Sequence, residues 1–181
     1  MIIDPVDLGV CPGYEYSGDP HRTAIVLPGA MLAGMPVNAF AIEAVLSQGW
    51  RAVLVWDVFL DRSQDAAAWV RERLDAAIAY ARSEQLLVIG KSLSTRAAGP
   101  AAERALPAVW LTPLLNDSEI VELIRGCTAP ALLVGGTADP MWDGAIAHEL
   151  SPDVLELEGA DHGLAKIGHL QQIVDAVASF V

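Results

Sequence analysis

Six short apolar runs alternate with six helical patterns along the chain, and this alternation constrains the fold more than any other feature. The runs are "TAIVLP" (23–28), "RAVLVWD" (51–57), "LLVIG" (86–90), "AVWLT" (108–112), "ALLVGG" (131–136) and "DVLELEG" (153–159). Most are apolar at consecutive positions, which is typical of strands covered on both faces. The helical patterns occupy about 37–48, 63–83, 93–105, 117–126, 143–150 and 167–180. The alternation predicts an α/β fold with a doubly wound, mostly parallel sheet of about six strands.

One domain is expected over residues 1–181, with an irregular N-terminal segment over 1–20. The chain has 181 residues, of which 53% are hydrophobic and 19% charged, so it can bury one core. No linker, repeat or low-complexity stretch divides it. The clearest helical pattern is 63–83, where Ser63 is the expected N-cap and Val70 and Leu74 recur at helical spacing.

Charge and composition argue against several classes of partner. The formal net charge of −12 repels nucleic acid and anionic lipid, so we expect neither nucleic acid nor membrane as a partner. The uncharged stretch 24–42 holds Pro28 and Pro36, which would interrupt a spanning helix. The N-terminus lacks the basic start and long apolar core of a secretory signal, which predicts a cytoplasmic protein.

The two cysteines carry no recognisable chemistry. Cys11 and Cys127 lie far apart and match no metal or redox spacing, so we expect buried or free thiols. Neither a metal nor another cofactor is expected. The sequence does not distinguish a monomer from a homodimer.

The segment "LLVIGKSLST" (86–95) has two incompatible interpretations. A phosphate loop needs a glycine five positions before Gly90, but Gln85 stands there and four apolar residues follow it. A nucleophile elbow needs a strand, a tight turn with small residues around the serine, and an immediate helix. Gly90 and Ser94 flank Ser92 at two residues on either side. Ser92 is therefore a candidate nucleophile, and a helix-capping serine is the structural alternative.

Two later segments place polar residues directly after strands, where ligands gather in such a sheet. Asp139 lies in "GGTADP" and His162 in "GADHGL". With the elbow, they make the chain resemble the α/β-hydrolase family over roughly residues 20 to 181, in its small, lidless, dienelactone-hydrolase-like form. The family's order of nucleophile, acid and histidine matches these residues. The resemblance implies Ser92 as nucleophile, Asp139 as acid and His162 as base.

The same resemblance implies an oxyanion hole. One donor is the backbone N–H of Leu93, and the other is that of Ala30 in "LPGAML", with Met31 as the neighbouring candidate. Only "PLLND" separates the run at 108–112 from the next helical pattern, so no lid domain is expected.

An open, modest substrate pocket is expected near the predicted strand ends. Its candidate lining residues are apolar, with core packing as the alternative for each: Trp110, Leu114, Met141 and Trp142.

Other assignments stay open at this point. Asp117 or Asp143 could supply the acid, and a metal site of Asp139, Asp143, Asp161 and His162 is conceivable but has no metal-ligand spacing. The histidines His21, His148 and His169 are less well placed than His162.

Three residues depart from the family pattern. Ser94 replaces the usual second glycine of the elbow, and Lys91 is an uncommon residue before the serine. Pro100 is expected to end or kink the following helix near Ala98.

The sequence as a whole predicts a serine hydrolase that cleaves a small ester or thioester through an acyl-enzyme on Ser92. An acyltransferase or lactonase would use the same triad. The alternative from another class is a non-catalytic binding protein with this fold, which the altered elbow would favour.

Overall fold

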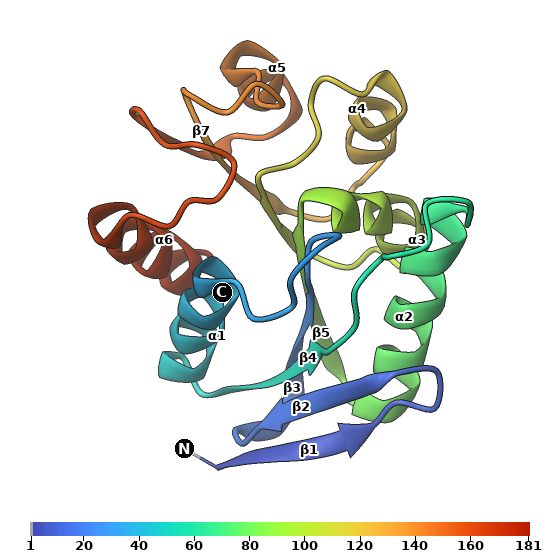
Figure 1. Cartoon of the computed structure of the whole chain (residues 1–181). Coiled ribbons are helices and arrows are strands. Elements are labelled where there is room, and N and C mark those ends of the chain that lie inside the picture. The colour runs from blue at the N-terminus through green and yellow to red at the C-terminus, as the bar shows by residue number, and fades with distance from the viewer. Residues whose placement is uncertain (1) are drawn as a thin grey trace.

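The computed structural model describes residues 2–181 and contains one eight-stranded sheet between two layers of helices (Figure 1). Its strands are β1 (Ile3–Asp7), β2 (Pro12–Tyr16), β3 (Asp19–Leu27), β4 (Trp50–Val55), β5 (Gln85–Lys91), β6 (Ala108–Leu111), β7 (Ala131–Gly136) and β8 (Asp153–Leu157). They lie in the order β1-β2-β4-β3-β5-β6-β7-β8. The predicted parallel sheet is confirmed for β3 to β8, and β2 runs antiparallel to both β1 and β4.

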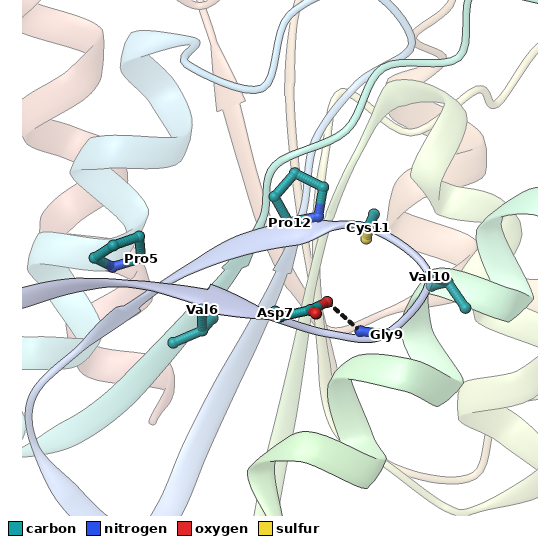
Figure 2. A pocket seen from close by; sticks show the side chains of 7 residues that line it. All are labelled: Pro5, Val6, Asp7, Gly9, Val10, Cys11 and Pro12. Atoms are coloured by element: carbon teal, nitrogen blue, oxygen red, sulfur yellow. Dashed lines mark hydrogen bonds between the residues drawn. The ribbon is translucent and has the colours of Figure 1, made fainter.

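The expectation of an irregular segment over 1–20 and of about six strands is wrong. Residue 1 lies outside the described residues, but β1 and β2 form a hairpin that extends the sheet beyond β4. At its turn Gly9 has φ +85°, a conformation that favours glycine, and its N–H donates to Asp7 Oδ1 at 2.8 Å (Figure 2). Periodicity does not reveal these strands because β1 lies at the sheet edge and both strands carry polar residues and prolines.

Within the described residues, seven helical segments cover the two faces of the sheet. They are α1 (Pro36–Ser47), α2 (Ala66–Ala81), the 3₁₀ helix η1 (Ser92–Ala97), α3 (Ala98–Glu103), α4 (Ser118–Arg125), α5 (Gly144–Leu150) and α6 (Ile167–Phe180). Helices α1 and α6 pack side by side on one face, and α2 to α5 cover the other (Figure 1). The apolar strands are consequently buried on both faces, as their composition predicts.

Helix α2 begins later than predicted and has a different cap. Asp65, not Ser63, is its N-cap, and the Asp65 carboxylate accepts from the N–H groups of Ala67 and Ala68 at 2.8 and 3.2 Å. Ser63 instead donates to Asp61 Oδ1 at 2.7 Å in the preceding turn.

Pro100 was predicted to end or kink the helix near Ala98, and the helical segment does not end there but changes type. The chain after β5 first forms η1, and α3 begins at Ala98 with Pro100 at its third position. A proline is tolerated there because the first backbone N–H groups of a helix have no intrahelical acceptor.

Residues 112–117 alone connect β6 to α4, so no lid domain is inserted at this point. In the described part of the chain, no helix is both long enough and apolar enough to cross a membrane.

Candidate active site

The turn after β5 presents Ser92 in a strained conformation. Ser92 has φ +53°, in the left-handed region that non-glycine residues rarely adopt. A Cβ atom on Gly90 would lie 2.7 Å from the Trp110 ring and 2.9 Å from the Ser94 carbonyl oxygen. Glycine at position 90 therefore lets the elbow (residues 90–94) close against β6, and the elbow projects Ser92 beyond the sheet.

The structure brings the three predicted triad residues together from the elbow and from the loops after β7 and β8. Ser92 Oγ lies 2.8 Å from His162 Nε2, and His162 Nδ1 lies 2.7 Å from Asp139 Oδ2. The Asp139 side chain has an exposed fraction of 0%, and its Oδ1 accepts from the Met141 N–H at 2.9 Å. A buried carboxylate bonded in this way places the imidazole proton on Nδ1, which leaves Nε2 able to accept a proton from Ser92.

The acid loop (137–143) and the histidine loop (158–166) are fastened to each other. The Ala138 N–H donates to the Ala160 carbonyl oxygen at 3.0 Å, and the Gly159 N–H donates to Thr137 Oγ1 at 2.8 Å. A Cβ atom on Gly136 would lie 2.2 Å from the same Ala160 oxygen. The close approach that pairs Asp139 with His162 therefore requires glycine at position 136.

The alternative acids have other partners. The Asp117 side chain caps α4 through the Glu119 N–H and bonds Arg96, and the Asp143 side chain caps α5 through the Ile146 N–H. Of the three candidate acids, Asp139 is the one that bonds His162.

The alternative histidines also lie away from Ser92. His21 bonds Glu84, while His148 and His169 lie in α5 and α6. Sequence reasoning therefore identified the histidine that the structure places beside Ser92.

The predicted oxyanion loop (28–35) lies beside the elbow. Ala30 and Met31 line the same cavity as Ser92, and Leu93 directly follows Ser92 in η1. Two hydrogen bonds hold this loop. Ser94 Oγ donates to the Pro28 carbonyl oxygen at 2.5 Å, and the Phe59 N–H donates to the Ala30 carbonyl oxygen at 2.9 Å. The serine that departs from the family pattern thus ties the elbow to the loop.

A cavity of about 510 Å³ opens in front of Ser92 and His162. Apolar side chains form much of its wall: Met31, Leu32, Met35 and Met141. Met31 is 77% exposed and Leu32 53% exposed, so the rim is open. This arrangement suits a small, largely apolar group next to the serine.

Three of the four predicted pocket residues lie elsewhere. Met141 lines the cavity, but Trp110 has an exposed fraction of 0% and packs beneath Gly90. Leu114 and Trp142 pack against the core on the α2 side, and Trp142 Nε1 donates to Glu156 at 2.7 Å. The prediction used only proximity to a strand end, and this criterion does not distinguish side chains that point into the core from side chains that face the cavity.

Lys91 is a functional candidate that sequence reasoning noted only as a departure from the family pattern. It has an exposed fraction of 4%, and its ammonium donates to Thr112 Oγ1 at 3.0 Å and to the His162 carbonyl oxygen at 2.9 Å. Burial lowers the pKa of Lys91 to about 8, although the carboxylates of Asp139 and Asp161 act in the opposite direction.

Neither cysteine has a place in this site. Cys11 and Cys127 are unpaired thiols, and burial raises the pKa of both, that of Cys11 to about 11. Within residues 2–181, no group of three or more His, Cys, Asp or Glu side chains is arranged to hold a metal ion.

The strand order, the single inverted strand β2 between β1 and β4, and the elbow after β5 define the α/β-hydrolase fold. The resemblance seen in the sequence is thereby confirmed at the level of fold. No protein-family model and no curated protein sequence matches the chain.

Solved structures are similar over nearly the whole chain. A dienelactone hydrolase from Anabaena variabilis is 17% identical with a TM-score of 0.77, over 98% of this chain and 94% of that one. An alpha-beta serine hydrolase homologue from Coxiella burnetii is 15% identical with a TM-score of 0.75, over 99% and 97%. Est1E from Butyrivibrio proteoclasticus, with ferulic acid bound, is 14% identical with a TM-score of 0.76, over 98% and 97%.

Proposed function

We propose that this protein is a serine hydrolase that cleaves a small ester or thioester through an acyl-enzyme on Ser92. The observation that carries the proposal is the continuous relay from Ser92 Oγ to His162 Nε2 at 2.8 Å and from His162 Nδ1 to Asp139 at 2.7 Å. A serine that only caps a helix has no use for a histidine and a buried carboxylate in line behind it.

Acylation begins when Ser92 Oγ attacks the carbonyl carbon of the substrate. His162 Nε2 takes the Ser92 proton, and the Asp139 carboxylate stabilises the resulting imidazolium. The substrate oxygen becomes an oxyanion, for which the backbone N–H groups of Leu93 and of Ala30 or Met31 are the proposed donors. The intermediate then expels the alkoxide or thiolate, which leaves with the proton from His162.

Deacylation repeats these steps with water. His162 Nε2 takes a proton from a water molecule as the water oxygen attacks the Ser92 ester. The second tetrahedral intermediate collapses, Ser92 Oγ recovers its proton from His162, and the carboxylic acid product leaves. The open rim around Met31 and Leu32 gives water direct access to this step.

The elbow's departures do not favour the binding-protein alternative. Ser94 fits its position by donating to the Pro28 carbonyl oxygen, and Pro100 lies in the first turn of α3 without disturbing Ser92. Acyl transfer and lactone hydrolysis use the same residues and are separate outcomes of a substrate screen.

The test is intact-mass detection of a covalent adduct from a fluorophosphonate probe. We expect one adduct on the wild type and none on Ser92→Ala or His162→Ala. Ser63→Ala, which changes an exposed serine in the turn before α2, serves as the control and should label like the wild type. Absence of an adduct on folded wild type with probes of several sizes would overturn the hydrolase proposal and favour the binding protein.

A further inference from the structure

Two adjacent residues of the elbow contact His162, one through its imidazole ring and the other through its main-chain carbonyl. Ser92 Oγ lies 2.8 Å from the imidazole Nε2, and the Lys91 ammonium donates to the His162 carbonyl oxygen at 2.9 Å. The backbone from Lys91 to Ser92 closes these contacts into a ring. The spacing between Ser92 Oγ and the imidazole therefore depends on where Lys91 places the His162 main chain.

The hydrogen bond from Lys91 is the main attachment of the His162 main chain to the elbow. Within residues 2–181, the His162 main chain makes no hydrogen bond other than the one from Lys91. The other bonds of the histidine loop lie within it, such as Gly163 N–H to Asp161 Oδ1 at 2.9 Å, or run to the acid loop, such as Gly159 N–H to Thr137 Oγ1 at 2.8 Å. They shape the loop but do not attach it to the elbow.

Thr112 fixes the other side of the ammonium. Its Oγ1 accepts from Lys91 Nζ at 3.0 Å, and its own N–H donates to the Val134 carbonyl oxygen at 2.7 Å. Thr112 is completely buried at the end of β6. The lysine thus links the neighbouring ends of β5 and β6 to the histidine loop.

A buried lysine at position 91 lowers the stability of the fold, which argues that its ammonium has a functional role. Burial of a cation is unfavourable, and an apolar residue of similar shape would fill the space without that penalty. The ammonium is the group that can donate to two acceptors on different loops at once.

We propose that Lys91 is a positioning residue, which holds His162 at hydrogen-bonding distance from Ser92 by anchoring the His162 carbonyl to the elbow. This inference rests on the proposed function, since it assigns a role in activating Ser92. It predicts a loss in the chemical step rather than in substrate binding, because Lys91 acts through His162.

Lys91→Met tests the proposal, because methionine fills similar space without a donor. We expect the rate of fluorophosphonate labelling at Ser92, and kcat for p-nitrophenyl acetate, to fall about 10- to 100-fold. KM should stay within about twofold of the wild-type value. The melting temperature should be unchanged or higher, because an apolar residue replaces a buried charge.

A spectroscopic measurement separates positioning from general stability. In the wild type labelled with ¹⁵N-histidine, NMR should show His162 with its proton on Nδ1. In Lys91→Met we expect the His162 ring signals to broaden or to report a mixture of tautomers, while the signals of His21 and His148 stay unchanged.

The matched control is Lys166→Met. Lys166 also donates to a main-chain carbonyl of the histidine loop, that of Gly159 at 3.3 Å, but from an exposed position. It should label and turn over at the wild-type rate. An equal loss in Lys166→Met would overturn the specific role of Lys91.

The remaining outcomes distinguish this inference from the proposed function. A wild type that does not label overturns both, whereas a labelled wild type with an equally fast Lys91→Met overturns the positioning role alone. If Lys91→Met fails to fold, Thr112→Val is the second variant, because valine has nearly the shape of threonine but lacks the hydroxyl that accepts from the ammonium. It should slow labelling about 3- to 10-fold at an unchanged melting temperature, and wild-type labelling by that variant would overturn the proposal.

Discussion

Ser94 Oγ donates a hydrogen bond of 2.5 Å to the Pro28 carbonyl oxygen, and both partners are buried between the elbow and the oxyanion loop. The family pattern has a glycine at position 94, which could not make this bond. The contact orients the peptide bond between Pro28 and Gly29, directly before the proposed donor at Ala30. A departure from the family motif thus provides a link between two parts of the site.

Ser94→Ala should therefore reduce activity as well as stability. We expect kcat for p-nitrophenyl acetate to fall about 10-fold, since the proposed oxyanion donors would lose their alignment. The unpaired Pro28 carbonyl should cost about 1–3 kcal/mol of unfolding free energy. Urea unfolding and steady-state kinetics measure the two effects.

Ser151→Ala is the matched control for this change. Ser151 is also buried and also donates at 2.5 Å to a main-chain carbonyl, that of Ala131, at the opposite end of the sheet. It should lose comparable stability with unchanged kcat. Equal kcat values for the two variants would contradict the alignment role of Ser94.

Asp139→Asn should abolish most activity while retaining the fold. The asparagine amide would donate to His162 Nδ1 and shift the imidazole proton to Nε2, which could then no longer accept from Ser92. We expect a fall in kcat of about 10⁴-fold. Asp143→Asn, which changes the rival acid and cap of α5, should keep wild-type kcat; inactivation by that change instead would reassign the acid.

Gly136→Ala should separate the acid from the histidine. The added Cβ would lie 2.2 Å from the Ala160 carbonyl oxygen, a main-chain atom that cannot move without displacing the histidine loop. We expect at least about 2 kcal/mol of destabilisation and a loss of fluorophosphonate labelling in the protein that remains folded. Thermal unfolding and intact mass report the two losses.

Gly168→Ala supplies the control for the same chemical change. No atom lies within 4 Å of a Cβ at Gly168, and the residue lies in the first turn of α6. That variant should be as stable as the wild type or slightly more so, because alanine favours helix. A stable and fully reactive Gly136→Ala would show that the two loops do not depend on this close approach.

The contacts among Ser92, Asp139 and His162 could be predicted because they follow a topological rule. Ser92, Asp139 and His162 each follow a strand of the parallel sheet, namely β5, β7 and β8, and the ends of parallel strands meet at one edge of a sheet. That rule needs only the order of elements, which the apolar runs show clearly. The 2.7 and 2.8 Å contacts then arise from residues separated by 23 and 70 positions.

The hairpin of β1 and β2 and the partners of Lys91 could not be predicted in the same way. The hairpin is only partly covered, with β1 at the sheet edge and β2 next to it, so "IDPVD" and "PGYEY" lack the continuous apolar signature of the central strands. The two acceptors of Lys91, Thr112 and the His162 carbonyl, are chosen by the path of a long side chain through the core. No local pattern in the sequence encodes that path.

The buried ammonium of Lys91 should make stability depend on alkaline pH. Its pKa of about 8 in the folded protein lies below the ordinary lysine value of 10.5, which applies to the unfolded chain. Between these values the unfolded chain binds more protons than the folded one, so the unfolding free energy rises with pH. Below pH 8 the destabilisation is fully present, and its relief by pH 10.5 should amount to about 3 kcal/mol.

The measurement is the unfolding free energy of the wild type and of Lys91→Met at intervals from pH 7 to pH 10.5. Other alkaline groups, such as Tyr16, Tyr80 and Cys11, whose pKa values are raised, are present in both proteins and cancel in the difference. The unfolding free energy of the wild type should increase relative to that of the variant as pH rises above 8. A difference that stays constant across this range would mean that Lys91 titrates as an ordinary solvated lysine, and that its ammonium is not confined between Thr112 and His162.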